Sequence, residues 1–135
     1  MNIIDKLLKV DQGKLAKPTK TIEIKRLSEI LGEEAIFICK ALDAEVYSEI
    51  QERSINMDNK GNLKNIDMGE MQLFVVLEGV TDPNFKSTEL MQYYGVSTPI
   101  DLIKKLLLPG EISQLFNIVN ELSGFGQAEV EDIKN

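Results

Sequence analysis

The stretch LLLPGEISQLFNIVNELSGF, from Leu106 to Phe125, places apolar residues at helical spacing on both sides of a Pro-Gly break. Pro109 ends the first helix, because a proline inside a helix removes a backbone hydrogen bond and clashes with the preceding turn. A second apolar stripe follows the break and predicts an amphipathic helix, with one face made of Ile112, Leu115, Phe116, Val119 and Leu122. The stretch therefore predicts two helices joined by a sharp turn.

Three consecutive leucines precede the break. Adjacent residues in a helix are about 100° apart, so Leu106, Leu107 and Leu108 cannot all face the same side. At least one of them is expected to point outward, onto a groove or a partner. Alternatively, another element of the fold covers that face, and the sequence leaves both possibilities open.

Further helices are predicted upstream of this stretch. Thr98 and Pro99 have the form of an N-cap followed by proline at the first helical position. Residues 67–70, DMGE, resemble a capping box and predict a buried helix that ends near Gly79. Between these two helices, VTDPNF is expected to be a turn containing Pro83, and STELMQYYG a short helix.

The pattern changes in the N-terminal half. TIEIKRL, residues 21–27, alternates as a half-buried strand, and AIFICKAL, residues 35–42, is a second strand-like run. SEILGEE between them predicts a turn, and together they predict an antiparallel hairpin. Asp43 is expected to cap a helix over AEVYSEIQERSI, and NMDNKGNLKN after it is expected to be a polar loop.

The expected fold class is α+β, a mainly α-helical single domain with an N-terminal antiparallel β-hairpin. Residues 1–18 are predicted to be a short helix over residues 3–9 and a polar linker. Residues 19–126 are predicted to form the folded domain, and residues 127–135 an acidic, flexible tail.

Composition argues against catalysis and against bound cofactors or metals. The chain has no histidine and a single cysteine, Cys39, so Ser-His and Cys-His pairs and Cys/His zinc sites are excluded. Residues 56–67 lie in the register of a calcium loop, but Lys60 takes a ligand position and Asp67 replaces the usual glutamate. No cofactor and no metal are expected.

The net charge of −7 argues against binding nucleic acid through its phosphates. The charged N-terminus is unlike a signal peptide, and no apolar run approaches the ~20 residues of a membrane span. A cytoplasmic protein is therefore expected.

Several motifs match one family in order and spacing. TIEIKRLSE, then DPNFKS, LLLPGEI and ELSGF, and finally EDIKN resemble the XkdN-like phage tail assembly chaperones over residues 19–135. The resemblance implies a non-catalytic chaperone in the host bacterial cytoplasm, absent from the mature virion. Its partner would be the tape measure protein, kept soluble until tail tube subunits polymerise around it. A longer product made by ribosomal frameshifting is a further expectation.

The hypothesis for partner binding is a groove at the proline break that accepts an amphipathic helix. Its expected lining is Phe85, Tyr94, Leu107, Leu108, Ile112 and Phe116. The same motifs can instead be purely structural, through Pro83, Pro109, Gly110, Glu111 and Gly124. An acidic adaptor or inhibitor that binds a basic protein is the alternative function. The sequence leaves the oligomeric state open.

Overall fold

The computed structural model describes residues 2–57 and 63–126. Its longer helices are α3 (Ala44–Arg53), α4 (Met68–Gly79), α6 (Pro99–Leu106) and α7 (Pro109–Leu122). The shorter helical segments are α1 (Ile3–Lys9), the 3-10 turn η1 (Gln12–Leu15), α2 (Lys25–Leu31) and α5 (Thr88–Tyr93). The strands are β1 (Thr19–Glu23), β2 (Ile36–Lys40), β3 (Ile55–Met57), β4 (Leu63–Ile66) and β5 (Val80–Asp82). The expected α+β, mainly helical fold is confirmed.

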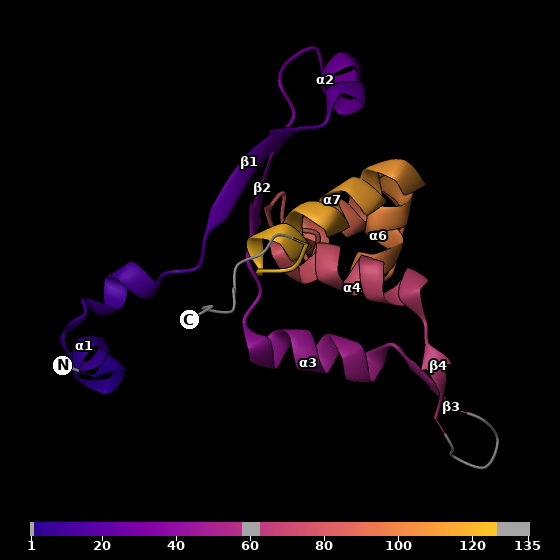
Figure 1. Ribbon diagram of the computed structural model, residues 1–135. Helices are drawn as coiled ribbons and strands as arrows, with labels where there is room; N and C mark the ends of the chain where they lie inside the picture. The colour runs from indigo at the N-terminus through magenta and orange to yellow at the C-terminus, as the bar shows by residue number, and fades with distance from the viewer. Residues whose placement is uncertain (1, 58–62, 127–135) are drawn as a thin grey trace.

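The main sheet is antiparallel, with strand order β1-β2-β5. Figure 1 shows the β1–β2 pair running along one side of the helices, with α2 connecting the strands at the top. Phe37 and Cys39 alternate with more exposed residues along β2 and are buried in the core. The predicted hairpin is therefore confirmed as a strand pair, and its inner face packs on helices.

The details of the hairpin differ from the prediction. β1 ends at Glu23, and the predicted turn is the helix α2, which ends at Gly32 with a φ of 75°. The Ser28 side chain stabilises the connection between β1 and β2, because its hydroxyl donates to Glu23 and accepts a 2.8 Å hydrogen bond from the N–H of Ala35. Ile24 and Leu27 pack toward the core at helical spacing, which favours the helix over a longer strand.

Helix α4 is the centre of the helical layer and contacts α3, α6 and α7. Its run LFVVL is a buried helix, as predicted, and the Asp67 carboxylate accepts a 3.1 Å hydrogen bond from the N–H of Glu70. A helix with apolar residues on all faces belongs in the interior, where several neighbours cover it. Its most buried residues are Met71, Leu73, Val75, Val76 and Gly79.

Two segments expected to lack strands contain them. The turn VTDPNF begins with β5, whose Val80 lies opposite Cys39 of β2. The predicted polar loop after α3 contains β3 and β4, which pair with each other, while residues 58–62 of the considered calcium loop lie outside the described residues. Strands of three or four residues are too short for their alternation to be recognised in a sequence. The predicted tail, residues 127–135, also lies outside the described residues.

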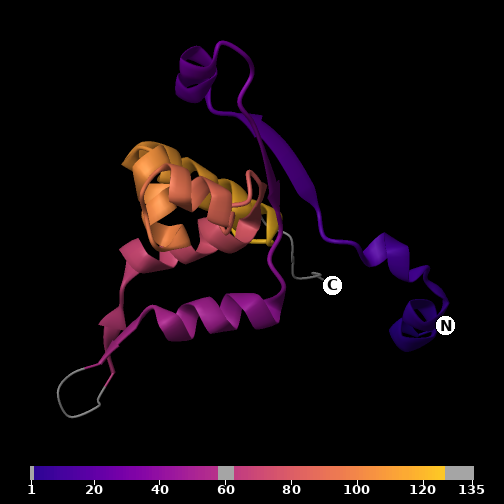
Figure 2. The same ribbon diagram turned by 180° about the vertical axis from the view of Figure 1, so that it is seen from behind.

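Residues 2–18 form an arm that precedes the sheet. Helix α1 within it contains no buried residue. Both views show α1 well apart from the helical layer, joined to it through the segment that leads into β1 (Figures 1 and 2). The predicted helix over residues 3–9 is thus present, with its apolar side uncovered.

Candidate partner-binding surface

The junction of α6 and α7 is a sharp elbow held by buried side chains. Thr98 caps α6 by accepting a 3.1 Å hydrogen bond from the N–H of Asp101. Leu102 and Ile103 of α6, Leu107 of the elbow, and Leu115 of α7 are all buried in the core. Because both helices are anchored in one core, the short segment between them has a fixed course.

Leu108 lies at the turn of this elbow and is 51% exposed. It occupies the N-cap position of α7, and its N–H donates a 2.8 Å hydrogen bond to the Glu111 carboxylate. A leucine side chain has no acceptor to return a bond, so only the glutamate half of a capping box is present. Glu111 therefore fixes the backbone that presents Leu108 to solvent.

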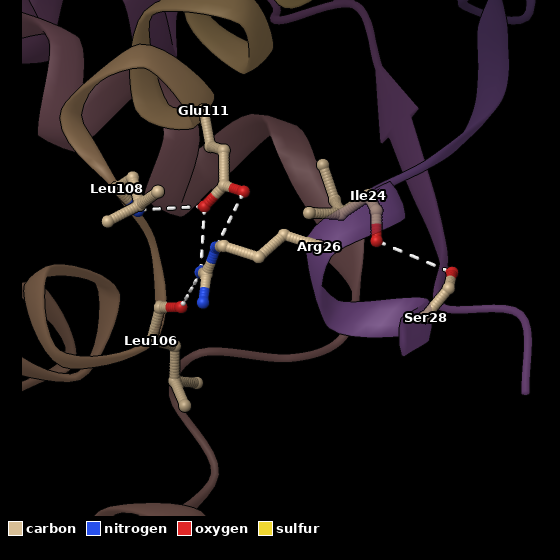
Figure 3. A network of polar contacts seen from close by, with 6 residues as sticks. All are labelled: Ile24, Arg26, Ser28, Leu106, Leu108 and Glu111. Atoms are coloured by element: carbon tan, nitrogen blue, oxygen red, sulfur yellow. Dashed lines mark hydrogen bonds and ion pairs between the residues drawn. The ribbon is translucent and has the colours of Figure 1, made fainter. Parts of the chain in front are cut away.

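The carboxylate of Glu111 is also paired with Arg26 of α2 (Figure 3). Arg26 Nε donates to Glu111 Oε2 at 2.9 Å, and Arg26 Nη2 donates to Oε1 at 2.8 Å. Nη2 also donates to the carbonyl of Leu106 at 2.8 Å, which caps the end of α6. One guanidinium thus joins α2 to both helices of the elbow, in the two-bond geometry that arginine favours.

This pairing makes the elbow sensitive to acid. The hydrogen bonds from Arg26, more than the one from Leu108, hold the pKa of Glu111 below its usual value. The stabilisation is complete above the unfolded-state pKa of a glutamate, about 4.3, and is lost as the pH falls through the lower folded pKa. We expect Glu111→Gln to reduce the free energy of unfolding by about 1–2 kcal/mol at neutral pH.

Urea denaturation of the Glu111→Gln variant and the parent at neutral and acidic pH checks this. The difference between the two proteins should shrink at acidic pH, where the parent also loses its carboxylate. Glu121→Gln, at the exposed end of the same helix, is the matched control and should cost little at either pH. A difference that stays constant down to strong acid would contradict the ionic role of Glu111.

Grooves lie on two sides of the elbow. One, of about 540 Å³, lies between the α2 region and the start of α7 and is lined by residues that include Ile24, Arg26 and Leu108. The other, of about 280 Å³, lies between the first half of α4 and the elbow, and its lining includes Leu73, Pro109 and Ile112. We call these two grooves and Leu108 the elbow surface.

The structure separates the predicted groove residues into three sets. Phe85 and Leu107 are core residues, with 1% and 4% of their surface exposed. Ile112 and Phe116 are half-buried against the core, and Ile112 lines the smaller elbow groove. Leu108 and Tyr94 are exposed, and Tyr94 lies at the end of α5 with its ring 5.0 Å from that of Tyr93.

The predicted structural residues have distinct geometries. Pro109 occupies the first turn of α7, and Glu111 caps it. Gly124 has a φ of 95°, a left-handed conformation that favours glycine, whereas Gly110 shows no such requirement. Pro83 follows a cis peptide bond.

The sequence gives no sign that Arg26 belongs to the elbow. TIEIKRL predicts a strand at this position, and the partner of Arg26, Glu111, lies 85 positions away. Glutamate at the third position after an N-cap was a usable signal for a capping role. Nothing local in the sequence indicated which cation would meet it.

The described residues contain no group of three or more histidine, cysteine, aspartate or glutamate side chains that could hold a metal ion. Among them there is also no helix long and apolar enough to cross a membrane. The fold and site define an α+β, mainly helical protein with a partly apolar surface at the junction of two helices.

Comparison with known proteins shows which family this chain belongs to. The crystal structure of the protein YqbN is similar in fold, with a TM-score of 0.61 at 23% identity, over 82% of this chain and 89% of that one. The family model of the phage XkdN-like tail assembly chaperone proteins matches residues 4–134. The chain belongs to this family.

Two relatives come from Bacillus subtilis (strain 168). The phage-like element PBSX protein XkdN is 26% identical over 129 residues, which cover 87% of this chain and 86% of XkdN. YqbN, described as uncharacterised, is 28% identical over 114 residues, which cover 82% of this chain and 76% of YqbN. The expected resemblance is thereby confirmed as family membership.

Proposed function

We propose that this protein is a non-catalytic chaperone that binds the tape measure protein of a phage or prophage tail and keeps it soluble in the bacterial cytoplasm. It would leave before the tail is complete, as tail tube subunits polymerise around the tape measure protein. Membership in a tail assembly chaperone family supports the general role. The tape measure protein as partner is part of the proposal.

The main structural support for this proposal is the exposure of Leu108. Leu108 is 51% exposed, so its side chain contributes little to the stability of the fold. It lies at the elbow between two grooves, where a partner can reach it. An amphipathic helix of a partner can cover Leu108 and place its own apolar side chains against Ile112 and Pro109. Burying a leucine fully contributes about 1.5–3 kcal/mol, so a few such contacts suffice for reversible binding.

The test is co-expression with the tape measure protein encoded by the same phage or prophage. We expect the parent protein to keep the tape measure protein in the soluble fraction and to co-purify with it. The double variant Leu108→Ser with Ile112→Ser should lose most of this effect while its circular dichroism spectrum stays that of a folded protein, although its temperature of thermal unfolding falls somewhat because Ile112 packs partly against the core.

Leu31→Ser is the matched control, because Leu31 is a leucine of similar exposure at the end of α2. It should leave solubilisation unchanged. If the double variant solubilises the tape measure protein as well as the parent does, the elbow surface is not the binding site.

Salt separates this function from the alternative, an acidic adaptor for a basic protein. Contacts between apolar side chains persist at high ionic strength, whereas attraction between exposed charges is screened beyond ~3 Å at 1 M salt. A complex that survives high salt supports the chaperone proposal. A complex that dissociates in salt, and forms equally with the double variant, supports the adaptor.

A further inference from the structure

A separate, partly apolar groove lies at the other end of α7. It has a volume of about 450 Å³ and is lined by Leu42, Tyr47 and Phe125, together with Lys17, Ala44, Ser48, Gln51 and Ser123. The rings of Tyr47 and Phe125 are 5.0 Å apart, and Phe125 is 48% exposed. We call this the Tyr47 groove.

The walls of the Tyr47 groove are fixed to each other. The N–H of Leu42 donates a 2.9 Å hydrogen bond to Ser123 Oγ, and this hydroxyl donates to the carbonyl of Val119 at 2.7 Å. Leu42 itself is buried. The groove is therefore a preformed hollow between the start of α3 and the end of α7.

Lys17 is the one charged side chain among the described residues that line the groove, where it pairs with Asp43 at 3.9 Å, and the residues around the groove are acidic. Ala44, Tyr47, Ser48 and Gln51 form the groove face of α3, and at helical spacing Glu45 and Glu52 flank that face. Glu121 lines an adjoining hollow that shares Lys17, Leu42 and Ser123 with the groove. A ligand for this site would be apolar on one side and positively charged.

The N-terminal arm is apolar on one side and carries a net positive charge. Helix α1 carries Ile3, Ile4, Leu7 and Leu8 along one side, and each is at least 57% exposed. Residues 1–18 contain four lysines and two aspartates, whereas the rest of the chain contains 11 basic and 20 acidic residues. The arm is thus basic and amphipathic, and the body that follows it is acidic.

We propose that α1 of one copy docks in the Tyr47 groove of a second copy. The apolar side of α1 covers Tyr47 and Phe125, and the arm's lysines lie near the glutamates that flank the groove. Opposite net charges favour the encounter of arm and body, and the apolar contacts hold it. Exchange of both arms buries both apolar faces in a two-fold pair.

The placement of the arm favours a second copy over the arm's own body. Lys17 lines the groove, and the carbonyl of Pro18 accepts a 3.0 Å hydrogen bond from the N–H of Ala41, which fixes the base of the arm beside its own groove. From there the arm leads away from the helical layer (Figures 1 and 2). It reaches another copy's groove in this direction, whereas docking on its own body requires the chain to reverse.

Sedimentation velocity of the full chain over a wide range of concentration tests the proposal. We expect a concentration-dependent dimer. Leu7→Ser with Leu8→Ser in the arm, or Phe125→Ser in the groove, should weaken dimerisation by roughly tenfold or more. All three side chains are about half-exposed or more, so these variants keep the fold, which circular dichroism checks.

Mixing the arm variant with the groove variant gives the decisive readout. The intact groove of the first can accept the intact arm of the second, so the mixture should form pairs more readily than either variant alone. Lys6→Glu with Lys14→Glu should also weaken the dimer, and added salt should weaken the parent dimer.

Three results would overturn the proposal. The first is a parent protein that stays monomeric at every concentration. The second is a dimer that tolerates the arm and groove substitutions. The third is a mixture that pairs no better than its components. Solubilisation of a tape measure protein through the elbow surface is a separate readout, so either proposal can fail alone.

Discussion

Gly79→Ala is expected to destabilise the fold by about 1–3 kcal/mol or more, although alanine is the better helix former. A Cβ atom at Gly79 would lie 2.5 Å from both Cγ atoms of Val119, across the contact between α4 and α7. Val119 is fully buried and β-branched, so it cannot rotate away without meeting other core atoms. Chemical denaturation of the variant and the parent measures the loss.

Gly110→Ala is the matched control, on the helix that Gly79 contacts. A Cβ at Gly110 has no atom within 4 Å, so we expect unchanged or slightly raised stability. The double variant Gly79→Ala with Val119→Ala should be more stable than the sum of the single effects predicts, since the shortened side chain gives the new methyl room. A Gly79→Ala variant as stable as the parent would contradict the close approach of the two helices.

Leu107→Ala is expected to lower the free energy of unfolding by about 2–5 kcal/mol. Leu107 is 4% exposed and packs in the core with Ile103, whose carbonyl accepts a 2.9 Å hydrogen bond from the Leu107 N–H. Truncation would leave a cavity at the elbow, where the backbone is held by capping bonds and cannot collapse. Such a loss is a large share of a total stability of about 5–15 kcal/mol.

Leu108→Ala tests the neighbouring leucine. Its side chain is half-exposed, so we expect a change within about 0.5 kcal/mol in the same denaturation experiment. Loss of tape measure solubilisation by the single variant Leu108→Ser would then reflect lost contact rather than lost folding. Equal costs for Leu107→Ala and Leu108→Ala would contradict the difference in burial between the two side chains.

The helices were predictable because their signals are local. The N-caps Asp67 and Thr98, the proline at the start of α7 and the 3.6-residue spacing of apolar side chains all act within one or two turns. Leu107 is buried and Leu108 is exposed, but both lie in extended backbone between α6 and α7, so the helical spacing used in the prediction does not apply to them.

The remaining features depend on contacts between distant segments. Helix α2 replaced a predicted turn because Ser28 and Ile24 find partners in the fold, and β5 pairs with a strand about 40 positions earlier. Phe85 is among the residues predicted to line the groove, and no local feature of the sequence marks it as buried. In the structure it packs against Phe37, with the ring centroids 6.2 Å apart.

The bond between the Leu42 N–H and Ser123 Oγ has a consequence for synthesis, because it joins residues 81 positions apart. At roughly 5–20 residues per second, a ribosome needs roughly 4–16 s to extend the chain from β2 to the end of α7. Through that interval the inner face of β2 lacks its helical cover. The nascent chain must therefore stay unaggregated with an apolar strand exposed, and folding of the sheet onto the helices follows completion of the last helix.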